Sequence, residues 1–185
     1  MNCTWPAKDE QMLHYHDTEW GVPIHDDKKH FEFLILDCFQ AGLSWKTILH
    51  RRKQFKKAFS NFDVKKVAKF DENKVVELMQ NEGIIRNKLK ITGTIQNAKF
   101  FIDIQKEFGS FDKYIWQFVN NKTIVTKVKQ SSEIRATSAE SDAMSLDLKK
   151  RGFKFTGSTI CYAYMQAAGM VNDHLITCSR FKELI

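Results

Sequence analysis

The amino-acid sequence predicts an all-α protein that forms one domain over residues 1–185. Apolar residues recur at helical spacing along much of the chain, and no stretch alternates convincingly enough between apolar and polar residues to form a sheet. The only two prolines stand at positions 6 and 23, so no later helix is interrupted by proline. Apolar residues make up 43% of the composition, which supplies a substantial core.

The first elements are an irregular segment and then a buried helix. Residues 1–23 contain at most a short helix around residues 9–16, followed by a turn at residues 20–23. The buried helix is expected to begin near Asp26 or Asp27 and to run to about Ala41. From Phe31 to Ala41 its only polar residues are Glu32, Asp37 and Gln40. A helix that is apolar on nearly every side belongs in the middle of a domain.

Asp37 is the anomaly in this helix, because its face is shared with Phe33, Leu34 and Ala41. An unpaired carboxylate there is costly, so it must be protonated, paired or lining a cavity. Gly42 fits a left-handed helix end, and Ser44 can cap the next helix. One reading is a pocket for a flat, positively charged or amine-bearing ligand. The other is a core aspartate that caps a neighbouring helix.

The remaining helices are expected from apolar periodicity and capping residues. Their expected ranges are 44–59, 64–69, 72–80, 87–108, 111–119, one after residue 137 that ends at 149–152, and one from 156–159 to 168. Asp63 and Asp71 are the expected N-caps of two of them, and Thr137 with Glu140 is the expected capping box. Leu89 is expected on the inner face of the longest helix.

A polar surface loop is expected over residues 120–137, with a β-prone patch at residues 123–128. Two other segments can hold a phosphate. A glycine turn at residues 81–86, followed by basic residues, can present backbone N–H groups to DNA, although an ordinary helical hairpin is commoner. The helix start at residues 156–159 offers open N–H groups and hydroxyls.

The charge of the chain favours a polyanionic partner. The formal net charge is +7 and the pI is about 9.2, which suits nucleic acid or a membrane surface. The outward face of the helix at 44–59 is basic. The simplest interpretation is that these charged side chains form a solvent-exposed surface. No secretory signal and no apolar run of membrane-spanning length occurs in the sequence. A membrane-surface protein is disfavoured because the basic residues are spread over several segments. We expect a cytoplasmic monomer without a membrane partner, and its four cysteines are thiols or metal ligands.

A metal site is a second hypothesis. His174 and Cys178 are four residues apart, which on a helix places both side chains on one face. Cys3 and His16 at the other end of the chain complete a tetrahedral Cys2His2 set, typical of structural zinc. His14 and Asp173 are competing ligands, and free thiols with surface histidines are the simpler alternative.

Several segments, in order along almost the whole chain, resemble the bacterial 3-methyladenine DNA glycosylase I family. They are Cys3-x-Trp5, Tyr15-His16-Asp17-x-Glu19-Trp20-Gly21-Val22-Pro23, Gln40-Ala41-Gly42-Leu43-Ser44-Trp45, Gly83-Ile84-Ile85-Arg86, Lys149 to Phe155, Gly157-x-Thr159-Ile160-Cys161 and Val171-Asn172-Asp173-His174. Each segment is modest by itself, but the ordered set is very specific.

The resemblance implies a helix-hairpin-helix fold whose termini are joined by a structural zinc ion, Zn2+. The family's zinc ligands map onto Cys3, His16, His174 and Cys178. The family's base-recognition positions map onto Tyr15, Asp37 and Trp45, and its DNA-binding hairpin maps onto Gly83 with Ile84 and Arg86. We expect Asp37 to be the catalytic residue and Trp20 to join the base-binding group. Lys154, Ser158 and Thr159 are expected to contact DNA, and Gly42 and Leu43 are the candidates to fill the gap left by the flipped base.

The chain departs from the family pattern at Asp37, where members typically carry glutamate, and at Cys38, often glycine there. The implied activity is the monofunctional hydrolysis of 3-methyladenine from alkylated double-stranded DNA, with 3-methyladenine as product. Aromatic rings stack on the cationic base, and Asp37 accepts hydrogen bonds from its amine. No lysine stands where an amine nucleophile is expected, so no strand cleavage is predicted. The alternative is a damaged-DNA-binding protein with weak or no catalysis.

Overall fold

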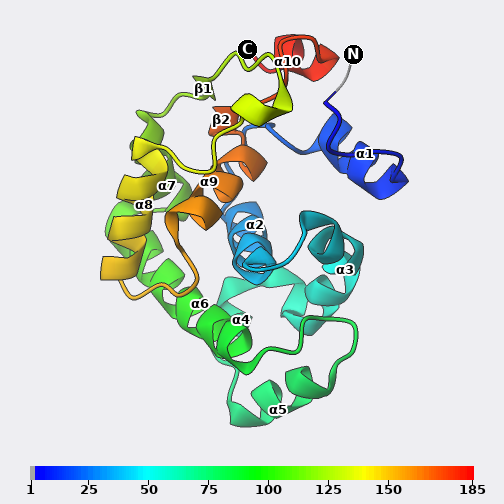
Figure 1. The fold of residues 1–185 in the computed structure, drawn as a ribbon. Coiled ribbons are helices and arrows are strands. Elements are labelled where there is room, and N and C mark those ends of the chain that lie inside the picture. The colour runs from blue at the N-terminus through cyan, green and yellow to red at the C-terminus, as the bar shows by residue number, and fades with distance from the viewer. Residues whose placement is uncertain (1–2) are drawn as a thin grey trace.

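The computed structural model describes residues 3–185, which form a mostly helical protein (Figure 1). The α-helices are α1 (Glu10–Thr18), α2 (Asp27–Gln40), α3 (Trp45–Ala58), α4 (Val64–Val67), α5 (Glu72–Gln80), α6 (Lys88–Phe108), α7 (Phe111–Ile115), α8 (Ala139–Lys150), α9 (Ser158–Ala167) and α10 (Ser179–Glu183). The short 3-10 helices and strands are η1 (Ser60–Phe62), η2 (Trp116–Val119), η3 (Ser131–Glu133), β1 (Ile124–Val125) and β2 (Val171–Asn172). The predicted helical class is confirmed.

Helix α2 is the centre of the fold. Its N-cap, Asp26, accepts a hydrogen bond from the backbone N–H of Lys29 (2.8 Å), and all residues from His30 to Phe39 are buried. The helix packs against α3, α6, α7 and α9. Figure 1 shows it between α9 and α3, in the middle of the molecule. The side chains of α2 therefore reach several neighbouring elements at once.

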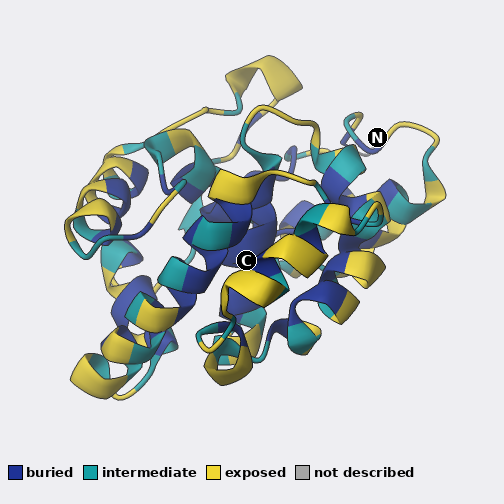
Figure 2. Cartoon of the chain, turned by 90° about the horizontal axis from the view of Figure 1, so that it is seen from below, coloured by how far each residue is buried: buried dark blue, intermediate teal, exposed yellow. Residues whose placement is uncertain are grey.

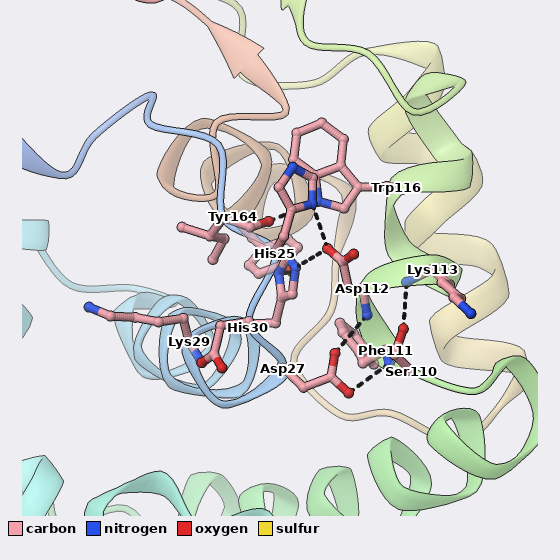
Figure 3. A network of polar contacts seen from close by, with 12 residues as sticks. His25, Asp27, Lys29, His30, Ser110, Phe111, Asp112, Lys113, Trp116 and Tyr164 are labelled. Carbon is pink, nitrogen blue, oxygen red and sulfur yellow. Dashed lines mark hydrogen bonds and ion pairs between the residues drawn. The ribbon is translucent and has the colours of Figure 1, made fainter.

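A buried polar network joins α2 to α7 and α9 (Figure 3). Burial lowers the pKa of His30, so its ring is neutral near pH 7. Its Nε2–H donates to Asp112 (3.0 Å), and its Nδ1 accepts from the hydroxyl of Tyr164 (2.6 Å). Asp27 accepts hydrogen bonds from the backbone N–H groups of Phe111 (3.0 Å) and Asp112 (2.9 Å) at the start of α7. These contacts fix the position of α9 relative to α2.

A buried ionic group joins the end of α1 to α2 and α3. Arg52, which is 9% exposed, donates to both carboxylate oxygens of Glu19 (2.7 and 2.8 Å) and to Glu32 (2.6 Å). The guanidinium holds the pKa of Glu19 below its usual value despite burial. Charge-assisted bidentate bonds of this kind fix orientation as well as distance.

Strands β1 and β2 form a two-stranded parallel sheet, with Ile124 opposite Val171 and Val125 opposite Asn172. The prediction that the chain contains no sheet is wrong at this point. Each strand has only two residues, which is too short for apolar and polar residues to alternate visibly. The β-prone patch lies where expected, but its partner is far along the chain.

Two expected local features near α7 and α8 differ from the structure. The capping box of α8 consists of Ser138 and Ser141, whose side chains each accept from the other's backbone N–H, instead of Thr137 and Glu140. The expected helix over residues 111–119 divides into α7 and η2. At α8 a neighbouring serine with similar capping chemistry replaces the expected threonine, and after Ile115 the helix tightens into a 3-10 turn, as helix ends often do.

Leu89 is 72% exposed, so its expected place on the inner face of α6 is wrong. In this first turn Lys90 and Ile91 face inward instead. The Lys90 ammonium donates to the carbonyl oxygens of Phe39 (2.8 Å) and Ala41 (2.6 Å) at the C-terminal end of α2. A cation at a helix C-terminus satisfies carbonyls that have no helical partner.

The chain corner between α2 and α3 forms as expected. Gly42 has a φ of +76°, in the left-handed region, and the Ser44 hydroxyl caps α3. Seen from below, the buried residues gather in the middle and the exposed residues lie on the outer helix faces (Figure 2). Within residues 3–185, no helix is long and apolar enough to cross a membrane.

Candidate base-binding and metal sites

A cavity of about 290 Å3 lies at the C-terminal half of α2. Side chains from the N-terminal segment and from α1, α2, α3, α9 and the η3 region line it: Trp5, Tyr15, Trp20, Asp37, Gln40, Trp45, Ser131, Ile134, Ala163, Gln166 and Ala167. Its size lies near the lower end of the range of small-molecule pockets. All four predicted base-binding residues (Asp37, Tyr15, Trp45 and Trp20) therefore line one cavity.

Asp37 is 2% exposed, and its Oδ2 has no hydrogen-bond partner within residues 3–185. Burial raises the pKa of this carboxyl well above its ordinary value. None of the helix N-termini in the described chain is capped by Asp37, so the alternative reading of a core capping aspartate is wrong. A buried acceptor that faces a cavity without a partner indicates a ligand that donates hydrogen bonds.

Two indole N–H groups in the same cavity also lack a hydrogen-bond partner within residues 3–185. Trp5 Nε1 and Trp45 Nε1 are buried and find no acceptor in residues 3–185, and both side chains line the cavity. Buried polar atoms are normally hydrogen-bonded in native proteins, so a group of three in one cavity is unusual. The cavity thus offers one acidic acceptor and two donors inside an aromatic wall, which fits a flat heterocycle with polar edges.

The aromatic wall is built by edge and tilted contacts. The ring centroids of Tyr15 and Trp45 are 5.1 Å apart at 46°, and those of Trp5 and Trp20 are 5.0 Å apart at 70°. Tyr15 is buried, and its pKa is raised by burial and further by the nearby charge of Asp37. Its hydroxyl therefore keeps its proton at neutral pH. An aromatic wall with an acid beside it favours a cationic ring.

Four buried metal-ligating side chains meet beside this wall. They are Cys3, His16, His174 and Cys178, whose ligand atoms all lie within 4.8 Å of one another. Cys178 Sγ is 3.7 Å from both His16 Nε2 and His174 Nδ1, and Cys3 Sγ is 3.8 Å from His174 Nδ1. The predicted Cys2His2 set is therefore brought together from opposite ends of the chain. The competitor His14 is exposed and outside this cluster.

The expected helix for His174 and Cys178 is wrong. Both residues lie between β2 and α10, and Cys178 is the N-cap of α10. The chain nevertheless aims both side chains at one point, because the backbone N–H of His174 donates to Asn172 Oδ1 (3.2 Å) and turns the chain after β2. Burial lowers the pKa of His174 to about 4 and raises that of Cys3 to about 11.

Outer hydrogen bonds leave the correct imidazole nitrogen free on each histidine. His16 Nδ1 lies 2.7 Å from Asp17 Oδ1, and His174 Nε2 lies 3.0 Å from the carbonyl oxygen of Trp20. These partners accept protons, so the nitrogens that face the cluster carry lone pairs. Metal-bound histidines usually donate their other N–H in this way. The contact with Trp20 also connects the cluster to the cavity wall.

The predicted gap-filling residues lie at the cavity's edge. Leu43 is 40% exposed and Gly42 is exposed, between the lining residues Gln40 and Trp45. At the hairpin, Gly83 is packed so tightly that an added Cβ would meet Gln54 Cγ at 2.9 Å. Lys90, in α6 just after the hairpin, connects α6 to the Gly42 corner, because its ammonium donates to the carbonyl oxygens of Phe39 and Ala41.

The other predicted DNA-binding residues differ in accessibility. Ile84 is 3% exposed, and its backbone N–H donates to the carbonyl oxygen of Asn81 (3.4 Å), so this residue is buried and paired within the hairpin. Arg86 is exposed and near Glu82 (3.4 Å). Lys154 and Thr159 are also exposed, whereas the hydroxyl of Ser158 is bonded to Ser141 (2.8 Å). Ser158 is therefore occupied within the α8–α9 contact.

Several cavity residues escaped the sequence-based assignment. Gln166, Ala163 and Ala167 come from α9, and Ser131 and Ile134 come from the loop around η3. Trp5 stands in the Cys3-x-Trp5 segment, which is a signal that could have identified it. Gln166 carries no such signal, because a single polar residue in an apolar helix has no spacing that indicates its direction.

Comparisons with known proteins agree with this geometry. The family model for methyladenine glycosylase matches residues 5–181. DNA-3-methyladenine glycosylase 1 of Escherichia coli is 46% identical over 176 residues, which cover 95% of this chain and 94% of that protein. A crystal structure of a 3-methyladenine DNA glycosylase I has a TM-score of 0.95 at 42% identity, covering 97% of this chain and 98% of that one.

A second solved structure connects this fold to a ligand. It describes how 3-methyladenine DNA glycosylase I from Staphylococcus aureus recognises 3-methyladenine. It has a TM-score of 0.93 at 33% identity and covers 96% of this chain and 94% of that one. Family model, curated relative and structures agree along almost the full length. The chain belongs to the methyladenine glycosylase family.

Proposed function

We propose that this protein is a monofunctional DNA glycosylase that removes 3-methyladenine from alkylated double-stranded DNA. The observation that carries the proposal is the unpartnered, buried carboxyl of Asp37 in an aromatic cavity. Relatives named DNA-3-methyladenine glycosylase support the substrate. We expect one domain over residues 1–185, acting as a monomer in the cytoplasm.

The cavity recognises the base by charge and shape. 3-Methyladenine in DNA is cationic, so the aromatic faces of Tyr15 and Trp45 attract it more than they attract normal adenine. Asp37 accepts a hydrogen bond from the exocyclic amine. In the free protein burial favours the protonated carboxyl, and a cation that enters the cavity favours the carboxylate. The indole N–H group of Trp5 supplies a donor for a ring nitrogen.

The reaction needs little chemistry from the protein. The positive charge weakens the bond between C1′ and the base nitrogen, so the bond breaks as electrons move into the ring. Water adds to C1′ and loses a proton, leaving neutral 3-methyladenine and an abasic site. The Asp37 carboxylate stabilises the cationic base as it is held outside the stack.

DNA contacts are assigned to one rim of the molecule. Leu43, at the tip of the Gly42 corner, fills the gap in the stack. The hairpin around Gly83 and Ile84 is assigned to a phosphate contact, with exposed Arg86 as its charged group, because the N–H groups of Gly83 and Ile84 already donate to Asn81. Exposed Lys154 and Thr159, near the N-terminus of α9, contact the backbone elsewhere. The hydroxyl of Ser158 contributes only if it leaves Ser141.

The four Cys and His ligands are assigned to a structural zinc ion. Two thiols and two imidazoles are a donor set that suits tetrahedral zinc, and they leave no open position for catalysis. The nitrogens of His16 and His174 that carry lone pairs both lie 3.7 Å from Cys178 Sγ. When bound, the metal joins the two ends of the chain and fixes the wall around Trp20. It takes no part in the hydrolysis.

The test is base release from methylated DNA by the purified protein. We expect release of 3-methyladenine, with 7-methylguanine left in place. Asp37→Asn should lower the release rate by about 100-fold or more, because it removes the charge that stabilises the cation. Asp37→Glu keeps the charge and serves as the matched control, with activity retained. Release that is unchanged in Asp37→Asn would remove this residue from the mechanism.

The alternative function is a damaged-DNA-binding protein without catalysis. The aspartate in place of the family's glutamate is the feature that favours it, since the side chain reaches one methylene less far. This alternative predicts binding to alkylated duplex DNA with no released base. The same release assay, combined with a binding measurement on methylated and unmodified DNA, separates the two.

A further inference from the structure

Gln166 is the one cavity residue on α9 with a long polar side chain. It lies on the wall supplied by α9, whereas Asp37 lies on the wall supplied by α2. Its amide Nε2 donates to Asp173 Oδ2 at 2.7 Å. The assignments above give Gln166 no role, although its amide is half-buried and held in place.

Asp173 is an anchor that accepts hydrogen bonds from two elements. It is 1% exposed, and it takes the Thr126 hydroxyl on Oδ1 (2.6 Å) and the Tyr162 hydroxyl on Oδ2 (2.9 Å) in addition to Gln166. Tyr162 and Gln166 are four residues apart on α9 and therefore share a face. Burial and the neighbouring Asp173 raise the pKa of Tyr162, so its hydroxyl remains a donor.

This arrangement fixes which end of the Gln166 amide faces the ligand. A carboxylate accepts hydrogen bonds and donates none, so the amide must turn its nitrogen toward Asp173. Asp173 is not among the residues that line the cavity in the described chain. The amide nitrogen thus points away from the cavity wall, and the carbonyl oxygen Oε1 is the polar end left for the cavity.

We infer that Gln166, oriented by Asp173, is a specificity-determining residue that accepts a second hydrogen bond from the exocyclic amine of 3-methyladenine. This inference rests on the proposed function. The amine carries two N–H groups, and the Asp37 carboxylate, on the wall supplied by α2, accepts one of them, which leaves the second for Gln166. Guanine carries a carbonyl oxygen at the same ring position, which the Oε1 oxygen repels. Gln166 therefore selects 3-methyladenine over 3-methylguanine, and Asp173 is its positioning residue.

The first test is Gln166→Met, which keeps the length of the side chain and removes its acceptor. DNA carrying radiolabelled methyl groups is incubated with each protein, and released 3-methyladenine and 3-methylguanine are separated and timed. We expect release of 3-methyladenine to fall about tenfold, the scale of one lost hydrogen bond, with 3-methylguanine unchanged or faster. If the ratio of the 3-methyladenine release rate to the 3-methylguanine release rate is unchanged, including the case in which both rates fall equally, the inference is overturned.

Variants of the anchor separate orientation from simple packing. Asp173→Asn presents a carboxamide that can donate or accept hydrogen bonds. The side-chain amide of Gln166 is then free to flip, so the ratio of 3-methyladenine release to 3-methylguanine release should fall. Thr126→Val removes a different partner of the same carboxylate and leaves the Gln166 bond in place. It is the matched control, and its ratio should equal that of the unmodified protein. Loss of selectivity in Thr126→Val but not in Asp173→Asn would contradict the positioning role.

Calorimetry with the free bases tests the inference without catalysis. The unmodified protein should bind 3-methyladenine more tightly than 3-methylguanine, and Gln166→Met should weaken only the former, by about tenfold. If the unmodified protein releases no base, the proposed function fails, and this measurement still decides the role of Gln166. Equal affinities for both bases in the unmodified protein would refute it.

Discussion

Asp37 combines a buried position with a carboxyl group that finds no hydrogen-bond partner within residues 3–185. Its neighbours on α2 are apolar, and its Oδ2 meets no donor in residues 3–185. A hydrogen-bonded core residue would instead stabilise the free protein. Binding sites commonly retain groups of this kind, which are unfavourable in the free state and satisfied by the ligand.

The stability of the protein should therefore depend on Asp37 and pH. Burial raises the pKa of this carboxyl in the folded state above its ordinary value near 3.8. Below about pH 3.8 the carboxyl is neutral in both the folded and the unfolded state, so its burial does not reduce stability through ionisation. Stability is lost as pH rises from there through the raised pKa. We expect Asp37→Asn to be more stable than the unmodified protein at pH 7, with the difference vanishing near pH 3. Urea unfolding at several pH values measures this; a less stable variant at pH 7 would contradict it.

At the scale of elements, the cavity depends on how α1, α2 and α3 are held together. Tyr15, Asp37 and Trp45 come from these three helices. Arg52 and its two glutamates join the same helices, and the Arg52 guanidinium also lies 5.1 Å from the centroid of the Phe33 ring. By joining these three helices, the ionic group helps to position the aromatic side chains that line the cavity.

Arg52→Met should lower the free energy of unfolding by about 3–5 kcal/mol, because it leaves the buried carboxylate of Glu32 and the partly buried Glu19 without their main partner. Thermal and denaturant unfolding measure the loss. Lys53→Met, on the exposed side of the same helix, is the control and should change stability by less than about 0.5 kcal/mol. Equal small effects for both variants would show that the ionic group contributes little.

For the whole molecule, the two ends of the chain meet at the metal-ligand cluster. Figure 1 shows the N- and C-terminal regions on the same side, near α1 and α10. A link between Cys3 and Cys178 closes almost the entire chain into one loop. Because only the folded chain brings the four ligands together, the free energy of metal binding adds to the free energy of folding.

Cys178→Ser should lower metal content and reduce stability by several kcal/mol, because the binding free energy of the metal no longer supports the folded state. Metal analysis and thermal unfolding check both effects. Cys161→Ser is the matched control, since Cys161 is equally buried and lies outside the cluster. Brief exposure to a chelator should leave base release intact. Full stability of Cys178→Ser without metal, or rapid loss of activity with the fold retained, would disprove a purely structural metal.

The sequence by itself determined most of the helices, because caps and apolar periodicity are local properties. Ser44, Asp63 and Asp71 cap their helices as predicted, α2 begins at Asp27 as expected, and Gly42 ends α2 in the left-handed region. The ordered family segments also indicated the metal ligands and Asp37. The errors lie where distant segments decide the outcome, as at β1 and β2, or where a helix face depends on its neighbour, as at Leu89.

Only the tertiary structure decided how these parts form a site. It showed that Asp37 faces a cavity and caps no helix in the described part of the chain, that Trp5 and Gln166 share this cavity, and that His174 and Cys178 meet from a loop. Each of these facts depends on the packing of α9 and the two chain ends against α2. Local sequence patterns carry the preference for helix or turn, whereas the direction of a single polar side chain is set by contacts far away in the chain.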